Sequence, residues 1–124
     1  MSRKNLLVIT SVFGALAVII GAFGAHGLQK YVSIKELKAF ETGVRYHFYH
    51  VLIAFVYLTQ NRIKIISTRA IYFLLSGILL FSGSLYLIAI THITKLGIIT
   101  PFGGVCFIIA WTLIAMSVKN DYSE

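Results

Sequence analysis

Four histidines are the side chains of this sequence best suited to chemistry near neutral pH. They are His26, His47, His50 and His92. Imidazole binds Zn, Cu and Fe and ligates haem iron, so a metal or b-type haem site is one hypothesis, with His26, His50 and His92 as ligand candidates. The chain has no HxxxH or HExxH motif, and its single cysteine, Cys106, has no partner. The sequence therefore predicts no metal site and no cofactor, and hydrogen-bonding roles for these histidines at helix ends.

The composition excludes most soluble folds. Hydrophobic residues make up 58% of the chain and charged residues only 12%, whereas soluble domains carry about 25% charged residues. A soluble chain of this size cannot bury so much apolar surface, so the lipid bilayer must cover it. A formal charge of +7 would suggest nucleic acid for a soluble domain. Here the basic residues stand singly between apolar runs, which indicates contact with lipid headgroups and no nucleic-acid binding.

Four apolar segments predict a single transmembrane domain over residues 1–124. The expected spans are residues 6–25, 46–59, 70–90 and 101–118, and twenty helical residues cross a hydrocarbon core of about 30 Å. A cleaved signal peptide is the alternative for the first segment, because Arg3 and Lys4 precede it. Short connections between the segments favour an up-down-up-down bundle.

Local signals define two helix starts. Ser33 and Glu36 form a capping-box pattern, so the second span belongs to a helix that begins near residue 34. Its charged first turns are expected to form an amphipathic extension in the membrane interface. Thr100 followed by Pro101 predicts the N-cap of the last helix. The predicted fold class is thus all-α, an integral membrane four-helix bundle with an interfacial extension at the start of its second helix.

The basic residues give a weak basis for orientation. With the N-terminus inside, the inner set has six members against five outside; it comprises Arg3, Lys4, Arg62, Lys64, Arg69 and Lys119. The outer set is spread along the amphipathic helix. The positive-inside rule therefore places both termini, which lie on one side, in the cytoplasm.

The topology predicts a candidate polar cluster on one membrane face. It places the four histidines towards the same side whichever way the protein is oriented. The cluster consists of His26, Glu41, Arg45, Tyr46, His50 and Thr100. Polar side chains near membrane depth are costly and often functional.

Helical geometry divides the second helix into two faces. At 100° per residue, Gly43, His47 and His50 share one face, and Glu41 and Arg45 lie on the other. Glu41 and Arg45 are four residues apart in the favourable order, which predicts an ion pair.

Small residues recur along the spans. Because helices in lipid associate through close packing, these residues predict helix contacts, mainly within the bundle and alternatively between copies of the chain. The packing candidates are Gly14, Gly21, Gly24, Gly83, Gly103, Gly104 and Trp111. Trp111 lies well inside its span, so its indole N–H is expected to need a partner.

Three motifs carry a resemblance to a known family. They are GAFGAHGL from Gly21, FETGVRYHFYH from Phe40, and TPFGG from Thr100, followed by Trp111. Together they resemble the small membrane proteins of domain of unknown function 423, whose eukaryotic relatives are called transmembrane protein 256. The resemblance covers nearly the whole chain and implies a bacterial inner-membrane protein with four spans, but no activity. His47 departs from the family pattern, in which a Gln is expected.

The sequence favours a structural or accessory role beside a larger membrane assembly, without naming a ligand or partner. A metal or haem site, or a pathway for protons or small solutes formed by an oligomer, is the alternative. The pathway hypothesis is weakened because the inner halves of the spans have no ionisable residue that titrates near neutral pH. An enzyme is disfavoured, since no Ser, His and acid share a face and no glycine-rich phosphate loop is present.

Overall fold

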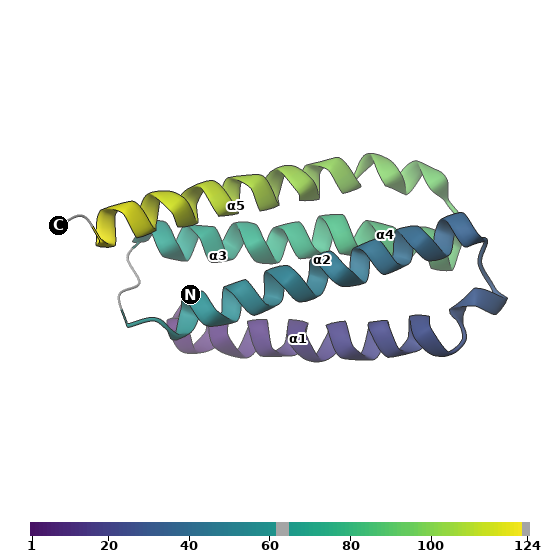
Figure 1. The fold of residues 1–124 in the computed structure, drawn as a ribbon, viewed down its shortest axis with the longest axis horizontal. Coiled ribbons are helices and arrows are strands. Elements are labelled where there is room, and N and C mark those ends of the chain that lie inside the picture. The colour runs from purple at the N-terminus through teal and green to yellow at the C-terminus, as the bar shows by residue number, and fades with distance from the viewer. Residues whose placement is uncertain (62–64, 123–124) are drawn as a thin grey trace.

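The computed structural model of the chain describes residues 1–61 and 65–122. Its long helices are α1 (Arg3–His26), α2 (Ile34–Thr59) and α5 (Thr100–Asp121), and a third rod formed without a break by α3 (Ile65–Gly77), the π-helical turn η2 (Ile78–Ser82) and α4 (Gly83–Thr91). Figure 1 shows the four rods side by side, with successive rods antiparallel and both termini at one end. The predicted all-α four-helix bundle is confirmed. Arg62 and Lys64, which were counted for the orientation, lie outside the described residues.

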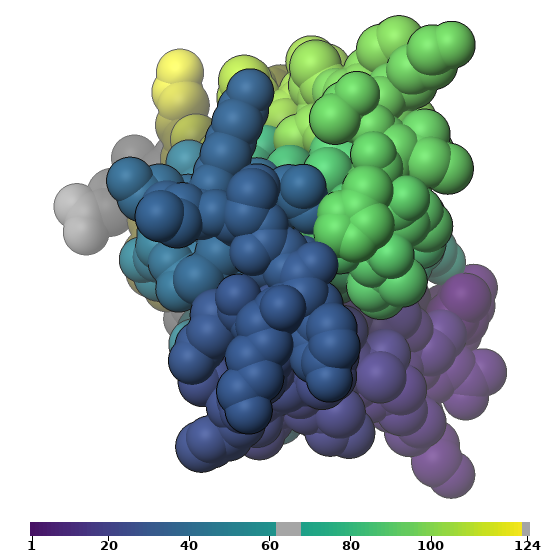
Figure 2. All heavy atoms as spheres, turned by 90° about the vertical axis from the view of Figure 1, so that its right-hand side faces the viewer, coloured from purple at the N-terminus to yellow at the C-terminus, as the bar shows by residue number. Residues whose placement is uncertain are grey.

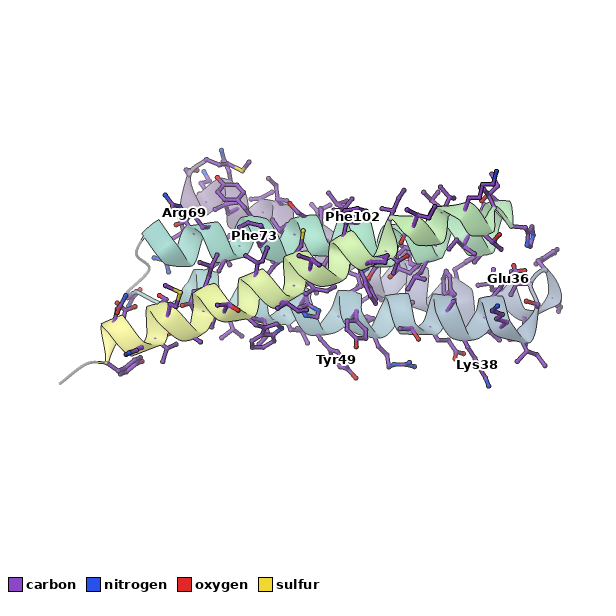
Figure 3. All side chains as sticks on the ribbon, turned by 90° about the horizontal axis from the view of Figure 1, so that it is seen from above. Glu36, Lys38, Tyr49, Arg69, Phe73 and Phe102 are labelled. Atoms are coloured by element: carbon purple, nitrogen blue, oxygen red, sulfur yellow. The ribbon has the colours of Figure 1, made fainter. Side chains whose placement is uncertain are left out.

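Short helices close the opposite end of the bundle. The 3₁₀ turn η1 (Leu28–Lys30) lies between α1 and α2, and η3 (Thr94–Ile98) lies between α4 and α5. Figure 2 looks onto this end, where the blue start of α2 and the green connection into α5 lie next to each other. Glu36 lies at this end as well, while Lys38 and Tyr49 point away from the bundle on one side of α2 (Figure 3).

The start of α2 follows the sequence prediction. Ser33 is its N-cap, and the Ser33 hydroxyl accepts a hydrogen bond from the Glu36 backbone N at 3.1 Å. The Glu36 carboxylate does not complete the capping box, because its Oε2 lies 2.7 Å from His92 Nδ1. This contact joins the first turn of α2 to the end of α4, where His92 has a left-handed φ of 58°.

The start of α5 differs from the prediction. Thr100 is already helical, and the N-cap is Ile99, whose carbonyl accepts from the backbone N of Phe102 at 3.1 Å. The 3₁₀ helix η3 leads directly into α5, and Ile99 between them is helical in conformation. The chain is therefore not extended before α5, and no side chain caps the helix there. The Thr100 hydroxyl is 2.5 Å from the Ser84 hydroxyl instead, so it joins α5 to α4.

Within the part of the chain that the structure describes, three stretches are long and apolar enough to cross a membrane. They are residues Arg3–His26, Thr68–Thr91 and Thr94–Asp121. The helix α2 is not among them, because charged residues in its first half and the histidines and tyrosines near its middle lower its mean hydropathy. In the rod formed by α3, η2 and α4, 50% of the residues in the most apolar stretch are buried. In the corresponding stretches of α1 and α5, 17% of the residues are buried. The outer surfaces of α1 and α5 therefore remain available to lipid or to other membrane helices.

Glycines allow backbones to approach closely at two crossings. A Cβ on Gly103 would overlap the backbone N of Phe81, and a Cβ on Gly77 would lie 2.5 Å from the Phe107 ring, so α5 packs directly on the third rod. A Cβ on Gly24 would overlap the Phe40 ring, which holds the end of α1 against α2. These positions fulfil the packing role expected of small residues in membrane helices.

The other predicted packing residues make weaker contacts. A Cβ on Gly21 would lie 3.2 Å from Val44, and one on Gly104 would lie 3.9 Å from Phe81. At Gly14 and Gly83 a Cβ would meet nothing within 4 Å in the described part of the chain. The expected packing within the bundle is therefore not seen at Gly14 and Gly83, which face outwards.

We predict opposite effects for two classes of glycine substitution. Gly103→Ala should lower the free energy of unfolding by about 1–3 kcal/mol, because the new methyl group forces two backbones apart. Gly14→Ala and Gly83→Ala should be neutral or should raise it by up to about 1 kcal/mol, since alanine is the better helix former and the space is open. Thermal unfolding in a mild detergent measures both. Equal effects at Gly103 and Gly14 would contradict the packing described here.

Candidate functional site

Two histidines of α2 lie near the middle of the bundle. His47 Nε2 is 2.8 Å from the carbonyl oxygen of Phe13, near the middle of α1, and His50 contacts Trp111, near the middle of α5. The sequence predicts them at one membrane face with His26 and His92. The difference arises because α2 is helical from Ile34 onwards and runs the length of the bundle, so its first half does not lie outside the bundle.

His47 joins three helices through its two ring nitrogens. Nε2 must donate to the Phe13 carbonyl, because a carbonyl oxygen only accepts. Nδ1 lies 2.9 Å from the Tyr86 hydroxyl of α4, and in the neutral ring it accepts from that hydroxyl. Both His47 and Tyr86 are buried. This geometry assigns His47 as the neutral tautomer with its proton on Nε2.

The π-helical turn η2 lies beside this histidine. Ser82, its last residue, is fully buried and donates to the backbone oxygen of Gly43 in α2 at 2.6 Å. Gly43 makes this short contact possible, because a Cβ there would lie 3.1 Å from the Tyr86 ring. Single π turns inside α-helices often occur at functional sites. We define the buried polar core as His47, Tyr86, Ser82 and the carbonyls of Phe13 and Gly43.

His50 has the opposite tautomer. Its Nδ1 lies 2.7 Å from the Tyr46 carbonyl and must donate to it, which leaves Nε2 to accept from the Trp111 indole N–H at 3.2 Å. The ring stacks on Phe107 with centroids 3.6 Å apart and on the Tyr46 ring at 5.8 Å. The expected partner for the Trp111 indole is thus His50. Trp111 itself remains 46% exposed.

These bonds decide how well the histidines suit a metal or haem. A ring nitrogen ligates a metal through its lone pair, and the lone pairs of His47 and His50 already accept hydrogen bonds from Tyr86 and Trp111. Ligation would require both rings to give up these buried partners. Within residues 1–61 and 65–122, no group of three His, Cys, Asp or Glu side chains gathers in a way that could hold a metal ion. The arrangement does not fit the metal or haem hypothesis.

The residues of the predicted one-face cluster lie in several places. His50 and Tyr46 stack in the middle of the bundle, Thr100 contacts Ser84, and His26 is exposed at the end of α1. Glu41 and Arg45 are exposed on the outer face of α2, as the helical geometry predicted.

The expected ion pair between Glu41 and Arg45 is not formed. Arg45 Nη2 donates to the Thr42 hydroxyl at 3.1 Å instead. The guanidinium thus extends back along α2 to a hydroxyl one turn earlier on the same helix. Glu41 makes no hydrogen bond or ion pair within the described part of the chain.

Tyr86, Ser82 and Thr10 are buried polar residues that the sequence did not predict as part of a site. Ser82 and Tyr86 are four residues apart in a long apolar helix, and this spacing of polar groups on one face was the signal available. Thr10 is 1% exposed, and its hydroxyl has no hydrogen-bond partner among the described residues. No sequence pattern marks Thr10, because a threonine in a membrane helix ordinarily bonds to its own backbone.

Comparison with known proteins gives a family match over the central part of the chain. Residues 20–104 match the family model described as "Protein of unknown function (DUF423)". This range contains the motifs that begin at Gly21, Phe40 and Thr100, so the resemblance drawn from them is confirmed. No solved structure matches the chain significantly.

Similar bacterial proteins cover nearly the same length. The UPF0382 membrane protein YwdK of Bacillus subtilis is 45% identical over 117 residues, which are 92% of this chain and 95% of its own. The UPF0382 inner membrane protein YgdD of Escherichia coli is 36% identical over 116 residues, 92% of this chain and 88% of its own. The UPF0382 membrane protein SAB0533 of Staphylococcus aureus is 37% identical over 115 residues, with 92% and 94% covered.

Two substitutions at His47 test its assigned hydrogen bonds. His47→Leu should lower the free energy of unfolding by about 1–3 kcal/mol, because the buried Tyr86 hydroxyl loses its acceptor. His47→Gln should retain most of the stability, since its amide offers one donor and one acceptor. Thermal unfolding in detergent compares the two, and equal losses would contradict the assignment.

Thr10 and Ser82 provide a matched pair of buried hydroxyls. Thr10→Val should leave the free energy of unfolding unchanged or raise it by about 1 kcal/mol, because it removes an unpaired polar atom and keeps the shape. Ser82→Ala should lower it by roughly 0.6–2 kcal/mol, because the bond to Gly43 is lost. The same unfolding assay measures both changes. A larger loss for Thr10→Val than for Ser82→Ala would contradict the hydrogen bonding described.

Proposed function

The chain belongs to the DUF423 family of small membrane proteins, and we propose that it is a non-catalytic packing subunit of a larger assembly in the bacterial inner membrane. It is a helical inner-membrane protein in contact with the lipid bilayer. The proposed role is that its outward surface packs against another membrane protein. It rests on a single observation, an apolar groove between α1 and α4 that no part of the described chain fills.

The proposal includes four membrane crossings. The helix α2 lies antiparallel beside α1 along most of its length (Figure 1), so it crosses wherever α1 does. Its charged residues from Lys35 to Arg45 lie in the half nearest the closed end, and residues 46–59 carry no formal charge. With four crossings the termini share a side, and the basic residues favour the cytoplasm for them.

The groove between α1 and α4 is the surface that carries the proposal. Its volume is about 130 Å³. Its lining residues are Phe13, Leu16, Ile20, His47, Ile78, Leu79, Gly83 and Tyr86. Gly83 offers an open backbone surface at its edge.

This surface suits a helix of another membrane protein. Helices in lipid associate through close contact at small residues, because the lipid tails remove the hydrophobic driving force. Gly83 allows such an approach without displacing any part of the described chain. The polar atoms of His47 and Tyr86 at the groove are already hydrogen-bonded to each other. The groove therefore offers shape and apolar surface rather than chemical reactivity, which supports a packing role over a catalytic one.

Photo-crosslinking in native membranes tests the packing role. A photoreactive residue at Leu16, which lines the groove, should give a discrete protein adduct. The same residue at Leu52, which is 59% exposed on the outer face of α2, should give only lipid adducts. Mass spectrometry of the adduct identifies either a second copy of the chain or another membrane protein.

A groove-filling variant supplies the control. Gly83→Leu should abolish the Leu16 adduct while it leaves thermal stability nearly unchanged, because the new side chain extends into open space. Lipid adducts alone at Leu16, or the same protein adducts at Leu16 and Leu52, would overturn the proposal.

A further inference from the structure

A second groove lies between α1 and α2, near the closed end of the bundle. Its volume is about 260 Å³. The lining residues are Gly21, Gly24, Ala25, Phe40, Glu41, Val44 and Arg45. They come from two of the three sequence motifs, the one that begins at Gly21 and the one that begins at Phe40. These two motifs, distant in the sequence, thus build one surface.

Two opposite charges border this groove without pairing with each other. Glu41 and Arg45 are both exposed and lie one helical turn apart. Glu41 has no hydrogen bond or ion pair within the described part of the chain. Arg45 uses one guanidinium nitrogen for Thr42 at 3.1 Å, while an arginine has five N–H donors. A carboxylate and most of a guanidinium are therefore free to bind a ligand.

The two charges lie towards the closed end of the bundle, where lipid headgroups would be if α1 crosses the bilayer. Phe40 packs against Gly24 and Val44 against Gly21, so this part of α2 lies opposite the last turns of α1, which ends at His26. With a rise of 1.5 Å per residue, Gly24 and Gly21 are about 3 and 8 Å from that helix end. Arg45 extends back towards the start of α2, in the direction of the bundle end. Both charges can thus reach the membrane interface.

The floor of the groove is apolar. Gly21 and Ala25 of α1 and Phe40 and Val44 of α2 line the groove beside the two charges, and none of them carries a polar side-chain atom. An apolar floor beneath a charged rim matches the order of groups in a phospholipid, whose charged head stands above its hydrocarbon chains. A free soluble ion would have no use for the apolar part of the surface.

We propose that this groove binds a phospholipid with a phosphoethanolamine headgroup, Arg45 binding the phosphate and Glu41 the ammonium group. Arginine is suited to phosphate because its planar fork donates two parallel hydrogen bonds. A primary ammonium can donate to the carboxylate, whereas the quaternary ammonium of phosphocholine has no N–H. Phosphatidylglycerol has no cationic group to pair with Glu41. Its phosphate at Arg45 would therefore lie near an unpaired carboxylate, which repels it. The proposed site is separate from the groove between α1 and α4.

Native mass spectrometry of the full chain can test this selectivity. The purified protein is equilibrated with equal amounts of phosphatidylethanolamine, phosphatidylcholine and phosphatidylglycerol in mixed micelles, and the bound lipid is identified. One molecule of phosphatidylethanolamine should be retained preferentially. Glu41→Gln should reduce its preference over phosphatidylglycerol roughly tenfold, and Arg45→Gln should reduce its affinity by a similar factor.

Charge-matched variants separate this site from general attraction to a protein of charge +7. Lys38→Gln removes the same charge as Arg45→Gln, but Lys38 points away from the bundle (Figure 3) and lies outside the groove. Glu36→Gln is the counterpart of Glu41→Gln. Neither control should change the lipid preference. Equal retention of phosphatidylglycerol by the unmodified chain, or equal effects of Lys38→Gln and Arg45→Gln, would overturn the proposal.

A groove-filling variant keeps the test independent of the charges. Ala25 lines the groove and is exposed, so Ala25→Leu should displace the lipid while Glu41 and Arg45 remain in place. Ala22, also exposed on α1, does not line the groove, and Ala22→Leu should leave lipid binding unchanged. Unchanged thermal unfolding confirms that each variant is folded. Retention of the lipid by folded Ala25→Leu would contradict the assigned position.

Discussion

The need to pair polar groups inside a lipid-covered protein shapes the centre of this bundle. Water is not available there to satisfy a donor or an acceptor, so each polar atom that is buried must find its partner in the chain. His47 meets this requirement with both ring nitrogens, one towards α1 and one towards α4. The outer helix α1, which packs mainly on α2, is thereby fixed in depth and rotation. Apolar packing alone specifies neither as strongly.

Close backbone contact and polar pairing depend on each other in this structure. Ser82 has a short side chain, and it reaches the Gly43 carbonyl only because Gly43 allows α2 and the third rod to approach. On the other side of the same rod, Gly103 brings α5 against the backbone of Phe81. The π turn lies between these two contacts. It changes the register of the helix where one face meets α2 and the neighbouring face meets α5.

The sequence predicted the helices well because their signals are local. The uncharged runs, the Ser33 cap and the periodicity of α2 each depend on neighbouring residues, and α2 has the predicted bounds. The depth of His47 and His50 was not predicted, because the polar first half of α2 resembles an interfacial segment when it is considered alone. Arg45 was expected to pair with Glu41 but hydrogen-bonds Thr42. Thr100 was expected to cap α5 but contacts Ser84. The choice between alternative hydrogen-bond partners depends on side-chain direction and on tertiary neighbours, which the spacing of residues in the sequence does not give.

The distribution of satisfied and free polar groups divides the surface into two kinds of contact. Along the groove between α1 and α4, His47 and Tyr86 are hydrogen-bonded to each other, so a helix packed there would be recognised by apolar shape. Along the groove between α1 and α2, Glu41 and most of Arg45 have no partner among the described residues, so a ligand bound there would be recognised by charge. Because α1 borders both grooves, a lipid held on one side and a helix packed on the other would act on the same outer helix. His47 hydrogen-bonds that helix to α2 and, through Tyr86, to α4, so a contact on either side of α1 would bear on the buried polar core.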